Sequence, residues 1–187
     1  MNRFTVILER ATLVSGAVLV SLAGLVWAEG AAKSRAAIVD FERQQAGQQL
    51  ALSDEVESTL AVLRIDSVEI EVPVFDSTSK SALKKGAGHV EGSARPGGEG
   101  NIAIAAHRDT FFRGLKDVEI GTDIEMATPQ GRRVFRVSEL KIVDPLDVSA
   151  LDPTEGTVLT LITCYPFYYV GPAPDRYIVR AELLQGN

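Results

Sequence analysis

The residues of this sequence best suited to chemistry are a thiol and a guanidinium, Cys164 and Arg176. Cys164, the only cysteine, ends the β-type run Val158–Thr163, and Arg176 begins a second one, Arg176–Leu183. A thiolate is a nucleophile, and a nearby guanidinium stabilises both it and the oxyanion formed by its attack. With an ordinary pKa near 8.5, only about 3% of a thiol is ionised at pH 7, so it needs a base or a cation. The residues alone leave two alternatives open, a small buried cysteine and a surface ion pair between Arg176 and Asp175.

Two histidines are candidates for the base that the thiol needs. His107 ends the apolar run Asn101–His107, whereas His89 lies in the glycine-rich segment Gly86–Gly100. A strand end holds a side chain more rigidly than a loop does, which favours His107, but the residues alone do not decide between them. Two histidines and one cysteine at these positions lack the spacing of a zinc site. No metal and no cofactor are therefore predicted.

Short β-type runs separated by turns supply the framework from residue 60 onward. Val68–Phe75 alternates apolar and acidic residues, as a half-exposed strand does, and its Pro73 indicates an edge or a bulge. A short helix is predicted over Ser79–Lys85, a loop over Gly86–Gly100, and a β-hairpin that turns at Pro129–Gly131. About eight strands with little helix predict an all-β domain, either a closed barrel or a sandwich.

An uncharged apolar segment, Ala11–Ala28, precedes this domain. As a helix its 18 residues reach about 27 Å, close to the roughly 30 Å hydrocarbon core of a bilayer. We interpret residues 1–28 as a signal anchor with one transmembrane helix; a cleaved signal peptide is the alternative, and both export the domain. Residues 29–58 are predicted to form a polar helical spacer, with a disordered tether as the alternative. The net charge of −6 argues against nucleic acid as a partner.

Three segments together resemble the motifs of sortases. Leu159–Cys164 (LTLITC), with an arginine twelve residues after the cysteine, resembles their TLxTC signature, and Gly88–Asp109 resembles the segment that ends in their catalytic histidine. Thr163–Ala181 is similar to the small sortases of Gram-negative bacteria, the marine proteobacterial type, which is itself similar to class D. The resemblance covers roughly residues 60–184, and it departs from many relatives at Ala106, where they have glycine before the histidine.

This resemblance implies an eight-stranded β-barrel and a cysteine transpeptidase. By position it makes Cys164 the nucleophile, His107 the general acid and base, and Arg176 the residue that binds substrate and stabilises the oxyanion. It implies that Thr163 assists the oxyanion and that His89 accompanies the loop without acting as the catalytic histidine.

The reaction that the resemblance implies is cleavage of an LPxTG-like sorting motif in an exported protein. A thioacyl-enzyme forms on Cys164, and an amine acceptor then displaces the thiol. The expected location is the inner (cytoplasmic) membrane, spanned once by residues 11–28, with the catalytic domain of residues 59–187 on the periplasmic side. Two alternatives stay open: a thiol peptidase that uses water as the acceptor, and a non-catalytic anchored domain that binds a partner and keeps Cys164 buried.

Overall fold

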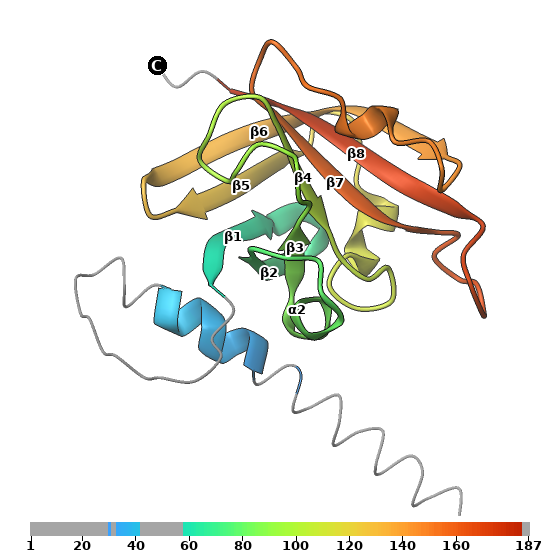
Figure 1. Cartoon of the computed structure of the whole chain (residues 1–187), viewed down its shortest axis with the longest axis horizontal. Helices are drawn as coiled ribbons and strands as arrows, with labels where there is room; N and C mark the ends of the chain where they lie inside the picture. The colour runs from blue at the N-terminus through green and yellow to red at the C-terminus, as the bar shows by residue number, and fades with distance from the viewer. Residues whose placement is uncertain (1–29, 31–32, 42–57, 185–187) are drawn as a thin grey trace, which may run out of the picture.

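The computed structural model describes residues 30, 33–41 and 58–184 of the chain. Residues 58–184 contain a closed β-barrel, with the strands in the order β1-β2-β3-β4-β7-β8-β6-β5 (Figure 1). The barrel confirms the prediction of an eight-stranded all-β domain, in its closed form. The strands are β1 (Thr59–Ile65), β2 (Ile70–Phe75), β3 (Ala87–His89), β4 (Asn101–Ala105), β5 (Asp123–Thr128), β6 (Gly131–Val143), β7 (Val158–Tyr165) and β8 (Asp175–Leu183).

Short helical turns connect these strands. The one predicted over residues 79–85 is α2 (Lys80–Lys85), which begins where the hydroxyl of Ser79 accepts a hydrogen bond from the amide of Ala82 at 3.1 Å. Such a cap satisfies an amide that has no partner within the helix. The remaining turns within residues 58–184 are 3-10 helices: η1 (Asp66–Val68), η2 (Arg113–Asp117) and η3 (Ser149–Leu151).

Apolar side chains at alternate strand positions fill the barrel. Ile102 and Ile104 of β4, Leu159 and Leu161 of β7, and Val179 of β8 all belong to one buried core cluster. Successive side chains of a strand point to opposite faces, so the residues between them lie on the outer wall. This alternation determines which side chains can meet in a site on the outside of the barrel.

The prediction of a loop throughout Gly86–Gly100 is wrong at its start, because Ala87–His89 forms β3. This strand pairs parallel with β2 and antiparallel with β4. A Cβ atom on Gly88 would clash with the backbone carbonyl of Ser77. Glycine is therefore present here because two backbone segments approach closely, not because the chain turns.

Pro73 lies at an open edge of β2, as its residue type predicts. β2 pairs with β1 along its length, but β3 pairs only with Val74 and Phe75. Proline has no amide hydrogen to donate, so it is tolerated where no second neighbour needs one. The predicted start of this strand at Val68 is two residues too early, since Val68 ends η1 and Glu69 adopts a left-handed conformation, with φ of 54°.

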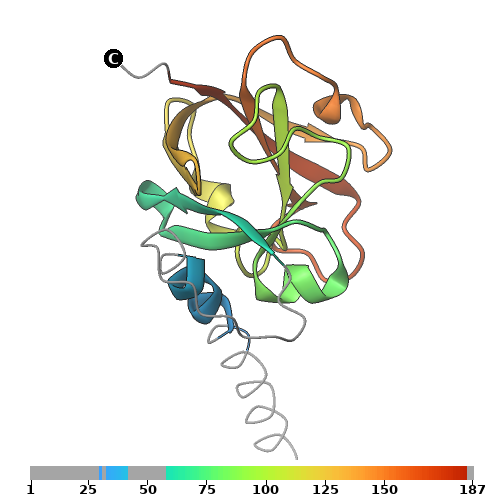
Figure 2. The same ribbon diagram turned by 60° about the vertical axis from the view of Figure 1, so that its left-hand side comes forward.

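A helix over residues 33–41 packs on the outer face of β1 and β5 (Figure 2). Phe41 is buried against Val62 and Ala127, and Ile38 joins the contact. This stretch belongs to the predicted spacer over residues 29–58, of which the structure describes only part. The predicted anchor over residues 11–28 lies outside the described residues; among those described, no helix is long and apolar enough to cross a membrane.

Candidate active site

Cys164 and Arg176 lie directly opposite each other on β7 and β8. They are paired residues in the antiparallel register of these strands, an arrangement in which Cα atoms lie about 4.5–5.5 Å apart. Both are out of phase with the inward-facing Leu161 and Val179, so their side chains share the outer face of the barrel. Cys164 is only partly buried, so the alternative of a fully buried thiol does not hold.

His107 reaches the same face because β4 and β7 run parallel and in register. Their last paired residues are Ala105 and Ile162, and one residue later the amide of Ala106 still donates to the carbonyl of Ile162 at 3.2 Å. Extended by two residues past the end of β4, this register would place His107 level with Cys164 of β7, one strand spacing of about 4.8 Å away. Ala106 is part of the buried core, so His107 next to it faces outward, and its side chain is exposed.

Thr163 lies on the other face of β7 from the thiol. Its side chain is buried, and its hydroxyl donates a hydrogen bond to the carbonyl of Ala106 at 2.7 Å. This bond ties the strand end that carries Cys164 to the residue before His107. The assistance to the oxyanion expected of Thr163 stays a prediction.

His89 is buried at the end of β3, and its side chain bonds to the glycine-rich loop that follows. Its Nε2 lies 3.0 Å from the carbonyl of Ala94 and 3.1 Å from the hydroxyl of Ser93. Ser93 directs its own hydrogen to the carbonyl of Val90 at 2.7 Å, so Nε2 of His89 must be the donor to Ala94. The structure thus separates the two histidines: His89 is bonded to a loop, whereas His107 is exposed on the outer face of the barrel, after the strand that pairs with β7.

The guanidinium of Arg176 is not used by an ion pair within the described part of the chain. Its Nη1 donates to the backbone carbonyl of Asp175 at 3.0 Å and no ion pair with the Asp175 carboxylate forms, so the alternative of a surface ion pair does not hold. A partly buried cation without a counter-ion can stabilise an oxyanion that forms at the neighbouring thiol.

Three aromatic rings, those of Tyr165, Phe167 and Tyr177, pack on one another at residues that follow Cys164 and Arg176 in the sequence. The ring centroids of Tyr165 and Tyr177 lie 6.2 Å apart in a stacked arrangement, and Phe167 packs edge-on against Tyr177 at 5.3 Å. Burial raises the pKa of Tyr177, and the neighbouring Tyr165 adds to the effect. Sequence reasoning missed Tyr177; its aromatic type and its inward phase, one residue after Arg176, were the available signals.

The connection between β6 and β7 flanks the site on another side. The side-chain amide of Asn101 at the start of β4 donates to the carbonyls of Ala150 and Asp152 at 2.8 and 2.9 Å. η3 in this connection borders a hollow of about 40 Å³ whose floor includes Val143, the residue of β6 that pairs with Arg176, and Ile178. The outer face next to Arg176 is therefore walled by a loop that β4 holds in place.

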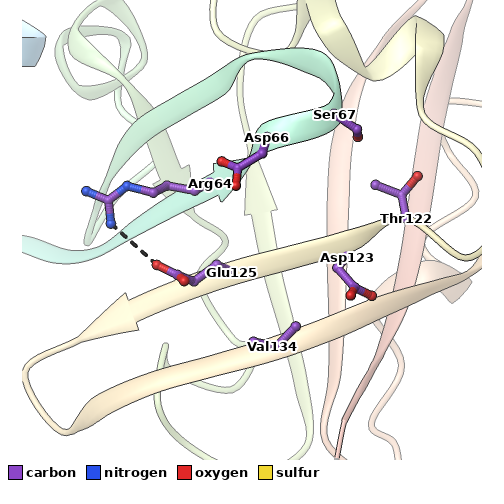
Figure 3. A pocket seen from close by; sticks show the side chains of 7 residues that line it. All are labelled: Arg64, Asp66, Ser67, Thr122, Asp123, Glu125 and Val134. Carbon is purple, nitrogen blue, oxygen red and sulfur yellow. Dashed lines mark ion pairs between the residues drawn. The ribbon is translucent and has the colours of Figure 1, made fainter.

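The larger hollow of about 360 Å³ lies on the opposite wall of the barrel, on β1, β5 and β6 (Figure 3). Three of its four charged side chains are paired: Arg64 lies 3.6 Å from Glu125, and Asp123 bonds Arg136 at 2.8 Å. Its lining provides neither a thiol nor an imidazole, so it is not the catalytic site. The lining residues are Arg64, Asp66, Ser67, Thr122, Asp123, Glu125 and Val134.

Comparisons with known sequences place the described barrel in one family. The model of the sortase domain matches residues 63–184. Sortase D of Bacillus subtilis is 35% identical over 136 residues, which are 72% of this chain and 69% of the relative. Sortase A of Streptococcus agalactiae is 29% identical over 130 residues, which are 65% of this chain and 51% of the relative.

Solved structures agree with this assignment. Sortase A from Corynebacterium diphtheriae is similar with a TM-score of 0.65 and 26% identity, over 80% of this chain and 69% of that one. Sortase C-1 from Streptococcus pneumoniae, at 19% identity, has the same fold, with a TM-score of 0.70 over 80% of this chain and 98% of that one. With a family model that spans well over half of its length, the chain belongs to the sortase family of cysteine transpeptidases.

Proposed function

We propose that this chain is a membrane-anchored sortase that cuts an LPxTG-like sorting motif of an exported protein and joins the cut end to an amine. Cys164 is the nucleophile, His107 the general acid and base, and Arg176 the anion-stabilising residue. The observation that carries this proposal is the pairing of Cys164 with Arg176 on the outer wall, beside the strand that leads to His107.

The proposed reaction has two halves. In the first, the Cys164 thiolate attacks a backbone carbonyl of the motif, and the oxyanion that forms faces the guanidinium of Arg176. Protonated His107 then gives its proton to the leaving amine, and a thioester remains. In the second half, an acceptor amine loses a proton to His107 and attacks the thioester, which forms a new amide and releases the thiolate.

We also propose that the chain is class D-like, of the marine proteobacterial type, and anchored through residues 11–28 with its catalytic domain on the periplasmic side. The 35% identity with Sortase D of Bacillus subtilis supports the class. The uncharged, helix-length segment Ala11–Ala28 supports the anchor. Extraction of whole-cell membranes with alkaline carbonate tests the anchor: the full chain is expected to stay in the pellet, and release into the supernatant would contradict anchoring.

Product analysis tests the reaction itself. The full chain is incubated with a peptide that contains Leu-Pro-x-Thr-Gly, with and without an added amine such as triglycine, and the products are identified by mass spectrometry. We expect the ligated product when amine is present and none in Cys164→Ala. Ser138→Ala is a control that should retain activity, because Ser138 is an exposed residue of β6 that lies next to Arg180 of β8 and not next to Arg176. Hydrolysis alone at saturating amine would replace the transpeptidase with a thiol peptidase.

A further inference from the structure

The loop between β7 and β8, residues 166–174, is hydrogen-bonded to Arg108, the residue that follows His107. Nη2 of Arg108 donates hydrogen bonds to the carbonyls of Tyr169 and Gly171, at 2.8 and 3.3 Å. The guanidinium carbon of Arg108 also lies 5.8 Å from the centre of the Tyr169 ring, within the range of a cation–π interaction. One side chain thus connects the segment after His107 with the segment after Cys164.

Little else in the described structure holds the far end of this loop. Tyr168 is 74% exposed and Val170 is 99% exposed, so burial contributes little to their order. Residues 166–174 take part in no backbone–backbone hydrogen bond outside the strands, as far as the described residues show. Among the described residues, Arg108 is the only one whose side chain donates hydrogen bonds to the backbone carbonyls of residues 166–174.

Arg108 is partly buried, whereas most arginine side chains are exposed to solvent. Its Nη1 is buried and has no hydrogen-bond partner among the described residues. Burying part of a guanidinium is unfavourable unless other contacts offset it. The two bonds from Nη2 and the ring of Tyr169 are the contacts that do so here, which couples the placement of Arg108 to that of the loop.

We propose that Arg108 is a positioning residue that holds the β7–β8 loop in its closed arrangement before a peptide binds. The proposal rests on the proposed function, because the loop follows directly after β7, the strand that carries the proposed nucleophile Cys164. A loop that is ordered in advance spares the peptide the cost of ordering it, and apparent affinity falls in proportion to the fraction of molecules in which the loop is closed. Arg108 contacts the loop and not the reacting atoms, so its loss affects binding before it affects the chemical step.

Arg113 provides a matched control. Its guanidinium carbon also lies 5.8 Å from a ring of the same loop, that of Tyr168. Among the described residues, however, Arg113 donates no side-chain hydrogen bond to the loop, and its side chain is exposed. Replacing Arg113 removes one charge and one ring contact but leaves both bonds from Arg108 in place.

Limited proteolysis tests the loop without any substrate. Chymotrypsin cuts after aromatic residues, so cleavage at Tyr168 and Tyr169 of the full chain reports opening of the loop. We expect Arg108→Ala to be cut about tenfold faster, Arg108→Lys to be intermediate, and Arg113→Ala to stay within about twofold of the unaltered protein. Equal cleavage of Arg108→Ala and Arg113→Ala would overturn the proposal. Arg108→Gln serves as the test variant should Arg108→Ala not fold.

Steady-state kinetics with a quenched fluorescent peptide containing Leu-Pro-x-Thr-Gly test the consequence for binding. In Arg108→Ala we expect KM to rise about five- to tenfold with kcat within about twofold, and in Arg108→Lys a partial recovery of KM. A fall in kcat at constant KM would show that Arg108 acts on the chemical step and would overturn the positioning role. If the loop opens but the unaltered protein cleaves no such peptide, the proposed function fails while the role of Arg108 in the loop stands.

Discussion

Replacing Thr160 by valine is predicted to destabilise the barrel through one buried hydrogen bond. The hydroxyl of Thr160, which is 0% exposed, donates to Oδ1 of Asn101 at 2.7 Å, and Asn101 is 3% exposed. Asn101 in turn donates from its amide nitrogen to the carbonyls of Ala150 and Asp152. This bond therefore connects β7, β4 and the loop that flanks the site.

The size of the effect follows from what valine leaves behind. Thr160→Val keeps the side-chain shape but leaves the buried Oδ1 of Asn101 without a donor, and an unpaired buried acceptor costs about 1–3 kcal/mol. For a domain of this size each kcal/mol lowers Tm by about 3–5 °C. Asn101→Ala removes all three bonds and is expected to cost more, about 2–4 kcal/mol. The double variant is expected to lose less than the sum of the two, because both changes remove the same bond.

Thermal unfolding followed by near-ultraviolet circular dichroism measures these differences. Thr157→Val is the matched control: it is the same substitution just before β7, at a hydroxyl that donates no hydrogen bond among the described residues and is not fully buried. The control is expected to stay within about 0.5 kcal/mol of the unaltered protein, as surface changes usually do. A loss in Thr160→Val no larger than that of the control would refute the reasoning.

Three further predictions concern the site and the core. Arg176→Lys is expected to lower kcat/KM for peptide cleavage at least about tenfold, because an ammonium does not reproduce the planar guanidinium; near-normal turnover would remove Arg176 from the site. Burial raises the pKa of Tyr177 in the folded state, so its contribution to stability is present below about pH 10 and is lost as pH rises through the folded pKa. Absorbance titration should show one late-ionising tyrosine, and Tyr177→Phe should remove it; an unchanged titration curve would count against the shift. Gly88→Ala should lower Tm by several degrees because its Cβ would clash with Ser77, whereas Gly156→Ala, with open space around it, should not; equal Tm values would contradict the close approach.

Local sequence signals predict much of the barrel. The helix α2 follows from its serine cap, a hydrogen bond between residues three apart, and Pro73 marks the open edge of β2 because proline has no amide hydrogen to donate. β3 was missed because its glycine, Gly88, is required by the close approach of the Ser77 backbone, whereas a run of glycines in the sequence indicates a loop. The barrel order, which places β7 between β4 and β8, is likewise a matter of long-range pairing.

The candidate site likewise has one part that the sequence predicts and another that depends on long-range pairing. The pairing of Cys164 with Arg176 could be anticipated, because two strands consecutive in the sequence are joined by one loop. The nearness of His107 depends on the parallel pairing of β4 with β7, far apart in the sequence, so residue types alone left His89 and His107 both open. The resemblance to sortases favoured His107. The bonds of Arg108 depend on the conformation of a loop and carried no signal that sequence reasoning recognised.

Mass spectrometry of the intact protein tests the central claim most directly. The full chain is mixed with a peptide containing Leu-Pro-x-Thr-Gly and quenched with acid within the first turnover. We predict a mass increase equal to the acyl fragment of the peptide, located at Cys164 by peptide mapping and removed when an acceptor amine is added before the quench. A cleaved peptide with no adduct on the protein, or an adduct on a residue other than Cys164, would contradict the account.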